Sequence, residues 1–117
     1  MTKKQFPSAV FLEFVLEQLN GMEGLTHRYM FGGYGLYQYG KFFAILYDGR
    51  VYFKTNLKSR MPYIQNGMKA FQPNEKQTLK NYFEVPGEIL EEPELLISWA
   101  HSAVHITIFI KIRIGDI

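Results

Sequence analysis

The sequence contains no cysteine among its 117 residues, which excludes disulfide bonds, thiolate metal sites and a cysteine nucleophile. This fits a reducing compartment, and we expect a cytoplasmic protein. An excess of one charge is also missing: 13 Lys plus Arg stand against 11 Asp plus Glu, for a net charge of +2. Because the basic residues are spread along the chain, strong general affinity for nucleic-acid phosphates is not expected.

Long apolar runs are absent too. No stretch approaches the roughly 20 apolar residues that a membrane-spanning helix needs. Glu13 and Glu17 interrupt the apolar segment near the N-terminus, and no small-residue cleavage site follows it, so it does not read as a secretory signal. We therefore expect a soluble protein that makes no contact with a membrane.

Aromatic residues, in contrast, are abundant. They make up 16% of the chain, with eight Tyr and ten Phe, and large rings bury much area per residue in a small core. A chain of 117 residues is long enough for one such core but not for two. We expect one domain over residues 1–117, with its core at about 8–104 and a divergent tail at 105–117.

The first half of the chain predicts one helix followed by strands. Residues 7–20 place apolar side chains at helical spacing, with Gly21 suited to end the helix. Residues 27–55 change to strand composition, and Asp48-Gly49 is a strong signal for a two-residue hairpin turn. Three or four antiparallel strands are expected there.

The second half predicts a short middle helix, two strands and a final helix. Residues 57–66 put Leu57, Met61 and Ile64 on one face before a glycine that can cap the helix. Two short strands, 69–73 and 78–86, and a helix over 91–104 follow; their ranges are read from the turn and strand residues. The fold class predicted is α+β: a two-layer domain with an antiparallel sheet of about five strands and N-terminal, short middle and C-terminal helices.

Trp99 is expected in the core of the final helix, on one side with Leu95, Leu96 and Ala103. After that helix, residues 106–114 alternate isoleucine with other residues, a period of two that favours a strand. Five isoleucines on one side of a strand would need cover. This predicts either pairing with an edge of the same sheet or a homodimer, and we favour the homodimer.

Several motifs that could carry chemistry have simpler structural explanations. The glycines Gly32, Gly33 and Gly35 are followed by strand residues rather than a helix, so a turn or bulge is favoured over a phosphate loop. His101 and His105 share a helix face, but a metal site generally needs a third ligand. The acidic residues before the final helix are expected to serve its dipole. We predict no catalytic residue, no metal and no cofactor.

The aromatic segment at residues 28–55 leaves two explanations open. Its rings could form a platform on which bases of a single-stranded nucleic acid stack, or they could be core and cross-strand partners, which is the favoured reading. A weak nucleic-acid-binding function is accordingly kept as the alternative. The contact residues it would use lie around the sheet edge: Lys54, Lys58, Arg60, Lys69, Lys76 and Lys80.

Residues 8–104 carry several short stretches in a fixed order: MFGG and GLY near residue 30, YFKT at 52–55, YFEVP at 82–86, and WA at 99–100. In this order they resemble the N-terminal domain of the TfoX/Sxy competence regulators. The motif residues that we assign a structural role are Met30, Phe31, Gly32, Gly33, Gly35, Tyr37, Lys54, Pro86 and Trp99.

The resemblance implies a non-enzymatic regulator of bacterial DNA-uptake genes that acts by contact with another protein, with the cyclic-AMP receptor protein or the transcription machinery as partner. Many members carry a second, C-terminal domain with a helical, nucleic-acid-binding character, and this chain is expected to hold only the first domain. Members also usually continue an alanine-rich helix after the WA position, where this chain has VHITIFIKIRIGDI.

Overall fold

The structure is a computed structural model that describes the backbone of residues 8–30 and 32–116, with side chains up to Ile106. Its described part has four helices and six strands in an α+β arrangement, one strand more than expected. Helix α1 (Ser8–Gln18) comes first, and the strands β1 (Leu25–Met30), β2 (Gly33–Gln38), β3 (Lys41–Tyr47) and β4 (Arg50–Lys54) follow. Helix α2 (Met61–Gln65) then precedes β5 (Ala70–Asn74) and β6 (Gln77–Glu84), and the chain ends with α3 (Gly87–Leu90) and α4 (Pro93–Asp116).

All neighbouring strands are antiparallel, in the order β1-β2-β3-β4-β6-β5. The turn between β3 and β4 has positive φ at both Asp48 (53°) and Gly49 (74°), which confirms the predicted two-residue hairpin. Tyr39 (50°) and Gly40 (80°) form a similar turn between β2 and β3. The β3–β4 register is regular from its turn, whereas the β2–β3 register shifts between Leu36 and Tyr37.

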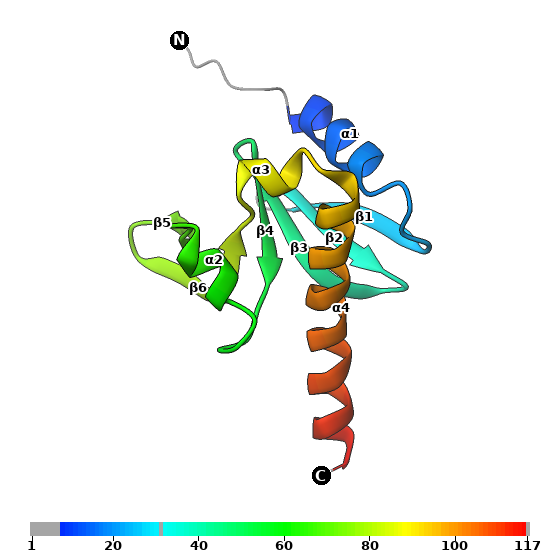
Figure 1. Cartoon of the computed structure of the whole chain (residues 1–117), viewed down its shortest axis with the longest axis vertical. Helices are drawn as coiled ribbons and strands as arrows, with labels where there is room; N and C mark the ends of the chain where they lie inside the picture. Colours follow the sequence, from blue (N-terminus) through cyan, green and yellow to red (C-terminus); the bar gives the residue numbers. More distant parts are fainter. Residues whose placement is uncertain (1–7, 31, 117) are drawn as a thin grey trace.

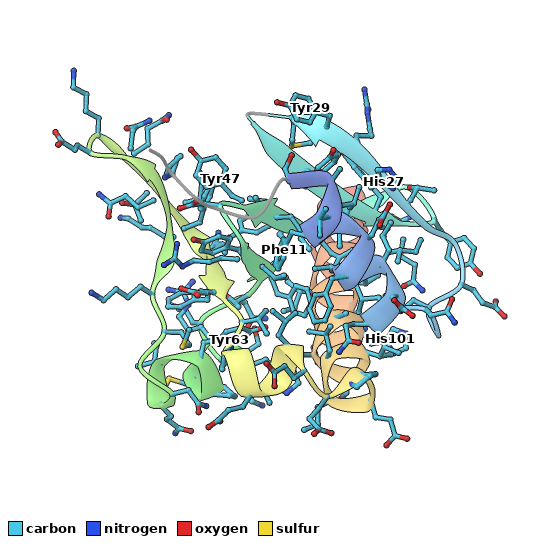
Figure 2. All side chains as sticks on the ribbon, turned by 90° about the horizontal axis from the view of Figure 1, so that it is seen from above. Phe11, His27, Tyr29, Tyr47, Tyr63 and His101 are labelled. Atoms are coloured by element: carbon cyan, nitrogen blue, oxygen red, sulfur yellow. The ribbon has the colours of Figure 1, made fainter. Side chains whose placement is uncertain are left out.

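The helices α1, α3 and α4 cover one face of the sheet (Figure 1). Their main core contains the fully buried side chains of Leu36, Leu46 and Phe53 from the sheet, with Val15 and Leu96 from the helices. Phe11 lies between α1 and the sheet (Figure 2). The helical layer against the sheet is therefore the source of most apolar burial, as the two-layer prediction required.

A second, smaller cluster lies on the opposite face of the sheet. Ile45 pairs with Tyr52, one position away from the Ala44–Phe53 pair of the main core, and alternate residues of a strand point to opposite faces. Phe71 of β5 packs on Tyr52 with 4.6 Å between ring centroids, so the β5–β6 hairpin shields this face.

The middle helix is shorter than predicted. Only Met61–Gln65 is helical, with Pro62 in the first turn, where its missing amide hydrogen costs nothing. Residues 57–60 instead form turns that Asn56 and Ser59 organise. Leu57, Met61 and Ile64 were predicted to share one helix face. In the structure all three are exposed and lie outside the core.

The predicted terminal strand is wrong, because α4 runs unbroken from Pro93 to Asp116. No glycine or proline interrupts residues 94–114, so a helix that has already formed can add one hydrogen bond per residue. Helix positions two apart are about 200° apart around the axis, so the period of two in this segment does not match the helical repeat. The argument for a homodimer through a strand face loses its premise, and the homodimer itself stays a prediction.

The placement of Trp99 also needs a correction. Leu96 and Ala103 are buried in the main core, but Leu95 is 48% exposed and does not share their face. Trp99 is half-buried and packs against this core from its margin, edge-on to Tyr63 of α2 with 4.7 Å between ring centroids. It therefore connects α4 with α2 rather than filling the centre of the domain.

Candidate functional site

An exposed apolar surface lies on the outer side of α2. Leu57 is 79% exposed, and Met61 and Ile64 are each 47% exposed. Arg60 N donates to Asn56 O at 3.1 Å, so the turn before α2 already follows a helix-like path and brings Leu57 beside Met61. We call these three residues the α2 apolar patch.

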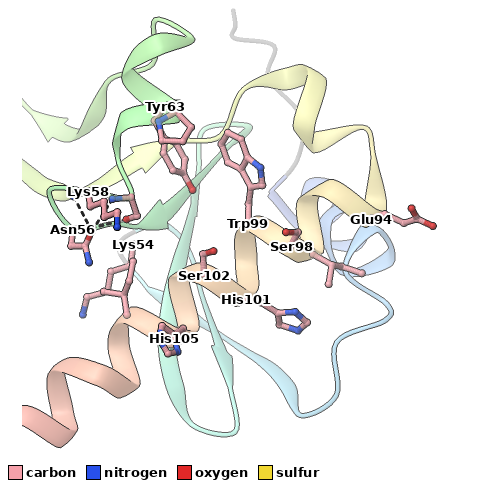
Figure 3. Close-up of a pocket in the computed structure, with 14 residues that line it drawn as sticks. Lys54, Asn56, Lys58, Tyr63, Glu94, Ser98, Trp99, His101, Ser102 and His105 are labelled. Carbon is pink, nitrogen blue, oxygen red and sulfur yellow. Dashed lines mark hydrogen bonds between the residues drawn. The ribbon is translucent and has the colours of Figure 1, made fainter.

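A groove lies on the other side of α2, between this helix, the loop that precedes it and α4 (Figure 3). Its volume is about 920 Å³, and most of its lining is apolar. Tyr63 from α2 and Trp99 from α4 both line it and contact each other (Figure 3), with the ring of Tyr63 mostly buried. The remaining lining residues come from the end of β4, the loop, α2 and α4: Lys54, Asn56, Lys58, Ser59, Pro62, Glu94, Ile97, Ser98, His101, Ser102, His105 and Ile106.

The loop wall of the groove is held by local hydrogen bonds. Asn56 Oδ1 accepts from the amides of Lys58 at 3.0 Å and Ser59 at 2.8 Å, and Ser59 Oγ accepts from the Asn56 amide at 2.9 Å. Thr55 is buried and donates from both its amide and its hydroxyl to Asn81 O. The loop is thus fixed to β6 before any ligand arrives.

Arg60 anchors the same loop and is already engaged within the protein. Its Nη2 donates to Asn81 Oδ1 at 2.8 Å, its Nε donates to Asn56 O at 3.2 Å, and its guanidinium carbon lies 5.3 Å from the ring centre of Phe83. Arg60 was predicted to contact nucleic acid, but in the structure its guanidinium group binds other residues of the protein and holds the loop in place.

The other predicted contact residues fall into two separate groups. Lys54 and Lys58 line the groove, whereas Lys69, Lys76 and Lys80 are exposed on or beside the β5–β6 hairpin. The structure thus divides the six residues rather than bringing them together on one face.

The aromatic residues of the sheet make contacts with one another. Tyr37 and Phe42 have ring centroids 5.2 Å apart, and Phe42 and Tyr82 have centroids 5.7 Å apart. Tyr47 contacts Phe71 at 5.4 Å in an edge geometry. Tyr37 and Phe42 are cross-strand partners, and the other two pairs join rings from strands that are not neighbours in the sheet. Rings packed on one another in this way favour the packing explanation over a free stacking platform.

Tyr29 on the edge strand β1 is the clearest exception. Its side chain is 68% exposed, and it points away from the body of the domain (Figure 2), although its ring touches that of Tyr34 at 5.4 Å. Tyr39 is also exposed, but it lies in the turn between β2 and β3, so these two rings do not form a platform for successive bases.

The motif glycines have distinct geometric roles. Gly32 has a φ of 79°, which other residues rarely adopt. Gly33 is buried with ordinary φ, but a Cβ there would collide with the carbonyl oxygen of Leu46 on β3. At Gly35 a Cβ would lie 2.7 Å from Met30 Cε and 2.8 Å from Phe42 Cε1. Close packing of β2 against its neighbours thus explains Gly33 and Gly35 without a phosphate.

The remaining motif residues are structural or lie outside the description. Met30 ends β1, Tyr37 lies on β2, and Pro86 is buried directly before α3. Phe31 lies outside the described residues.

The histidine and acidic side chains of the described residues form no cluster that could hold a metal ion. His27 lies on β1, away from His101 on α4 (Figure 2). Burial raises the pKa of Tyr63, and burial followed by the proximity of Tyr37 raises the pKa of Tyr82 to about 12. Phenols held neutral in this way are poor bases near pH 7.

Sequence reasoning identified the α2 face and the two histidines of the groove but missed the groove itself. Asn56 and Ser59 gave a usable signal, since an Asn three residues before a Ser is typical of a side-chain-capped turn. The approach of Tyr63 to Trp99 joins residues 36 positions apart and has no local signature.

Comparison with known families gives one match. The model of the TfoX N-terminal domain matches residues 17–106, which includes all six strands and the part of α4 that packs on the sheet. No curated protein matches the chain. In addition, none of the helices in the described residues is long and apolar enough to cross a membrane.

Proposed function

Because this chain belongs to the TfoX N-terminal domain family, we propose that it is a non-enzymatic regulatory module that controls bacterial DNA-uptake genes by contact with another protein. The observation that carries the proposal is the α2 apolar patch, defined by Leu57, Met61 and Ile64. Single exposed apolar residues are ordinary, but neighbouring ones on a small domain indicate an interaction surface.

The partner we propose is a component of the transcription machinery, with the cyclic-AMP receptor protein as the first candidate. A bacterial two-hybrid assay would test the intact chain against this receptor and against the subunits of RNA polymerase. The informative variant is Leu57→Asp with Ile64→Asp, because charges in the α2 apolar patch would have to be desolvated in an interface.

Leu79→Asp provides the matched control. Leu79 is an exposed apolar residue on β6 with 40% of its side chain accessible, and it lies outside the α2 apolar patch. We expect the double variant to lose the interaction and the control to keep it. Equal signals from the two variants, or no interaction with any transcription protein, would contradict the proposal.

Weak nucleic-acid binding remains the second candidate, and the observation that favours it is the group of exposed lysines around the β5–β6 hairpin, Lys69, Lys76 and Lys80. Three separated ammonium groups can neutralise few phosphates at once, so the affinity would be low and would fall steeply with salt. A titration of duplex DNA at two salt concentrations distinguishes this candidate from protein binding.

A further inference from the structure

The groove between α2 and α4 has an uneven distribution of charge. Lys54 and Lys58 stand at the loop side, and His101 and His105 line the α4 side. The one carboxylate among the described lining residues is Glu94, which lies at the start of α4 and far from the two lysines in Figure 3. The loop end of the groove therefore has a positive potential.

The two lysines also lack an acidic partner within the described residues, where the ion pairs of 4 Å or less are those of Arg50 with Asp48 and Glu84. Lys54 is half-buried at the end of β4, and Lys58 is exposed on the loop. An anion bound at this end would gain two ammonium groups without displacing an existing ion pair.

The floor of the groove is apolar and aromatic. Trp99 and Tyr63 meet edge-on at 4.7 Å, and Ile97 and Ile106 extend the apolar surface along α4. Such a floor suits a large apolar side chain, since aromatic residues bury much area at small entropic cost. The groove is open along α4 rather than closed over, so it accommodates an extended or helical chain segment better than a small molecule, which would remain largely exposed.

The charge of the groove argues against occupation by residues 1–5 of this sequence. This stretch, MTKKQ, contains two lysines and no acidic residue. From the same molecule or from a second copy, it would bring cations toward Lys54 and Lys58. Like charges in an interface cost binding free energy.

We infer that this groove binds an acidic segment of a partner protein, with a large apolar anchor residue against Trp99 and Tyr63 and carboxylates at Lys54 and Lys58. The inference rests on the proposed protein-binding function and adds the chemistry of the partner. The preformed loop wall, fixed by Asn56 and Ser59, would lower the cost of ordering the site on binding.

A peptide selection on the intact chain tests this inference. A random 12-residue display library is selected on the wild type, and individual peptides are then titrated while the fluorescence of Trp99, the single tryptophan, is recorded. We expect enriched peptides with two or more Asp or Glu beside a large apolar residue, and binding that changes the Trp99 emission and weakens with added salt.

The decisive variant is Lys54→Glu with Lys58→Glu, which reverses the charge at the loop end. The control, Lys76→Glu with Lys80→Glu, makes the same change in net charge on the β5–β6 hairpin, outside the groove. Reversal in the groove should weaken the selected peptides by about tenfold or more, and the control by less than about twofold.

Enrichment of basic or uncharged peptides, equal binding to the two double variants, or a selection with no enrichment would each overturn the inference. Saturation by octanoate at micromolar concentration would also overturn it, because the groove would then be a pocket for a small anion. The groove inference and the proposed function can fail separately. If the two-hybrid signal is lost with Leu57→Asp and Ile64→Asp but kept with Lys54→Glu and Lys58→Glu, the groove inference alone is refuted. Selected acidic peptides without any transcription partner would refute the proposed function alone.

Discussion

The glycine pair at the start of β2 offers a direct test of how the sheet is assembled. Replacing Gly33 by Ala would place a methyl group against the carbonyl oxygen of Leu46, in the backbone of the central strand β3. A flexible side chain could move aside, but a strand that is paired on both edges cannot. Overpacking of a core site costs about 1–3 kcal/mol, and a backbone neighbour places Gly33→Ala at the upper end, about 3 kcal/mol.

Two other glycines separate this steric effect from the general effects of adding a methyl group. At Gly32 the nearest atom to a new Cβ is Tyr47 Cε1 at 4.0 Å, so Gly32→Ala should cost only the left-handed strain of φ 79°, about 1 kcal/mol. Gly87, at the start of α3, has nothing within 4 Å. Gly87→Ala should leave the stability unchanged or raise it slightly, because alanine restricts the unfolded chain.

Thermal unfolding followed by circular dichroism gives the comparison. In a domain of this size about 1 kcal/mol corresponds to roughly 4 °C in Tm, so Gly33→Ala should lower Tm by roughly 12 °C and Gly32→Ala by roughly 4 °C. Gly33→Val should lower it further still. If Gly33→Ala melted within error of Gly87→Ala, the steric explanation of this glycine would be wrong.

Four further measurements test other parts of the structure. Trp99→Ala should lower the free energy of unfolding, measured by urea denaturation, by about 3 kcal/mol. This is the lower end of the range for a large aromatic residue, because Trp99 is half-buried at the margin of the core. An unchanged urea midpoint would refute its role in connecting α4 with α2. The pKa of Tyr82 is raised to about 12 in the folded protein, so its neutral form stabilises the protein below pH 10, and this contribution is lost as the pH rises toward 12. Tyr82→Phe should therefore make the loss of stability at alkaline pH less steep. The same loss in the variant as in the wild type would contradict the assignment. Fluorescence anisotropy with duplex DNA should show weak, salt-sensitive and sequence-indifferent binding, and a tight, sequence-selective complex at near-physiological salt would instead favour the nucleic-acid alternative. Sedimentation tests the homodimer that the sequence analysis favoured: self-association of the full chain, with a folded monomer for a chain ending at Ile106, the last described buried residue, would support it, and a full chain that is monomeric at high micromolar concentration would refute it.

The elements that the sequence predicted well are those determined by local chemistry. Asp48-Gly49 can adopt positive φ at both positions, and this feature alone sets the β3–β4 register. Pro93 and Glu94 mark the start of α4 because a proline and a carboxylate both suit a first helical turn. Such signals depend on neighbouring residues only, and a single sequence contains them in full.

The errors arose where two local patterns competed or where distant residues met. Residues 106–114 alternate as a strand would, but they directly follow a helix. Extending a helix that has already formed costs less free energy than starting a new element, so the segment is helical. Leu95 is exposed because the other side of α4 meets the sheet. The sequence shows which residues of a helix are apolar, but it does not show which of them pack on the sheet. The groove requires Lys54 at the end of β4 to lie beside α4, about 45 residues later, and no local pattern encodes that distance.

The two sides of α2 lie in different environments, one buried and one exposed, and both carry apolar residues. Its inner side supplies Tyr63, which is buried against Phe83 and Trp99 and holds the helix on the domain. Its outer side contributes no burial to the core, yet it carries Met61 and Ile64 beside Leu57. Polar residues at these three positions would keep the same inner contacts and improve solubility, so folding alone does not account for the apolar ones. A partner that covers the α2 apolar patch, with its acidic residues in the adjoining groove, would explain both sides of α2 with one interface.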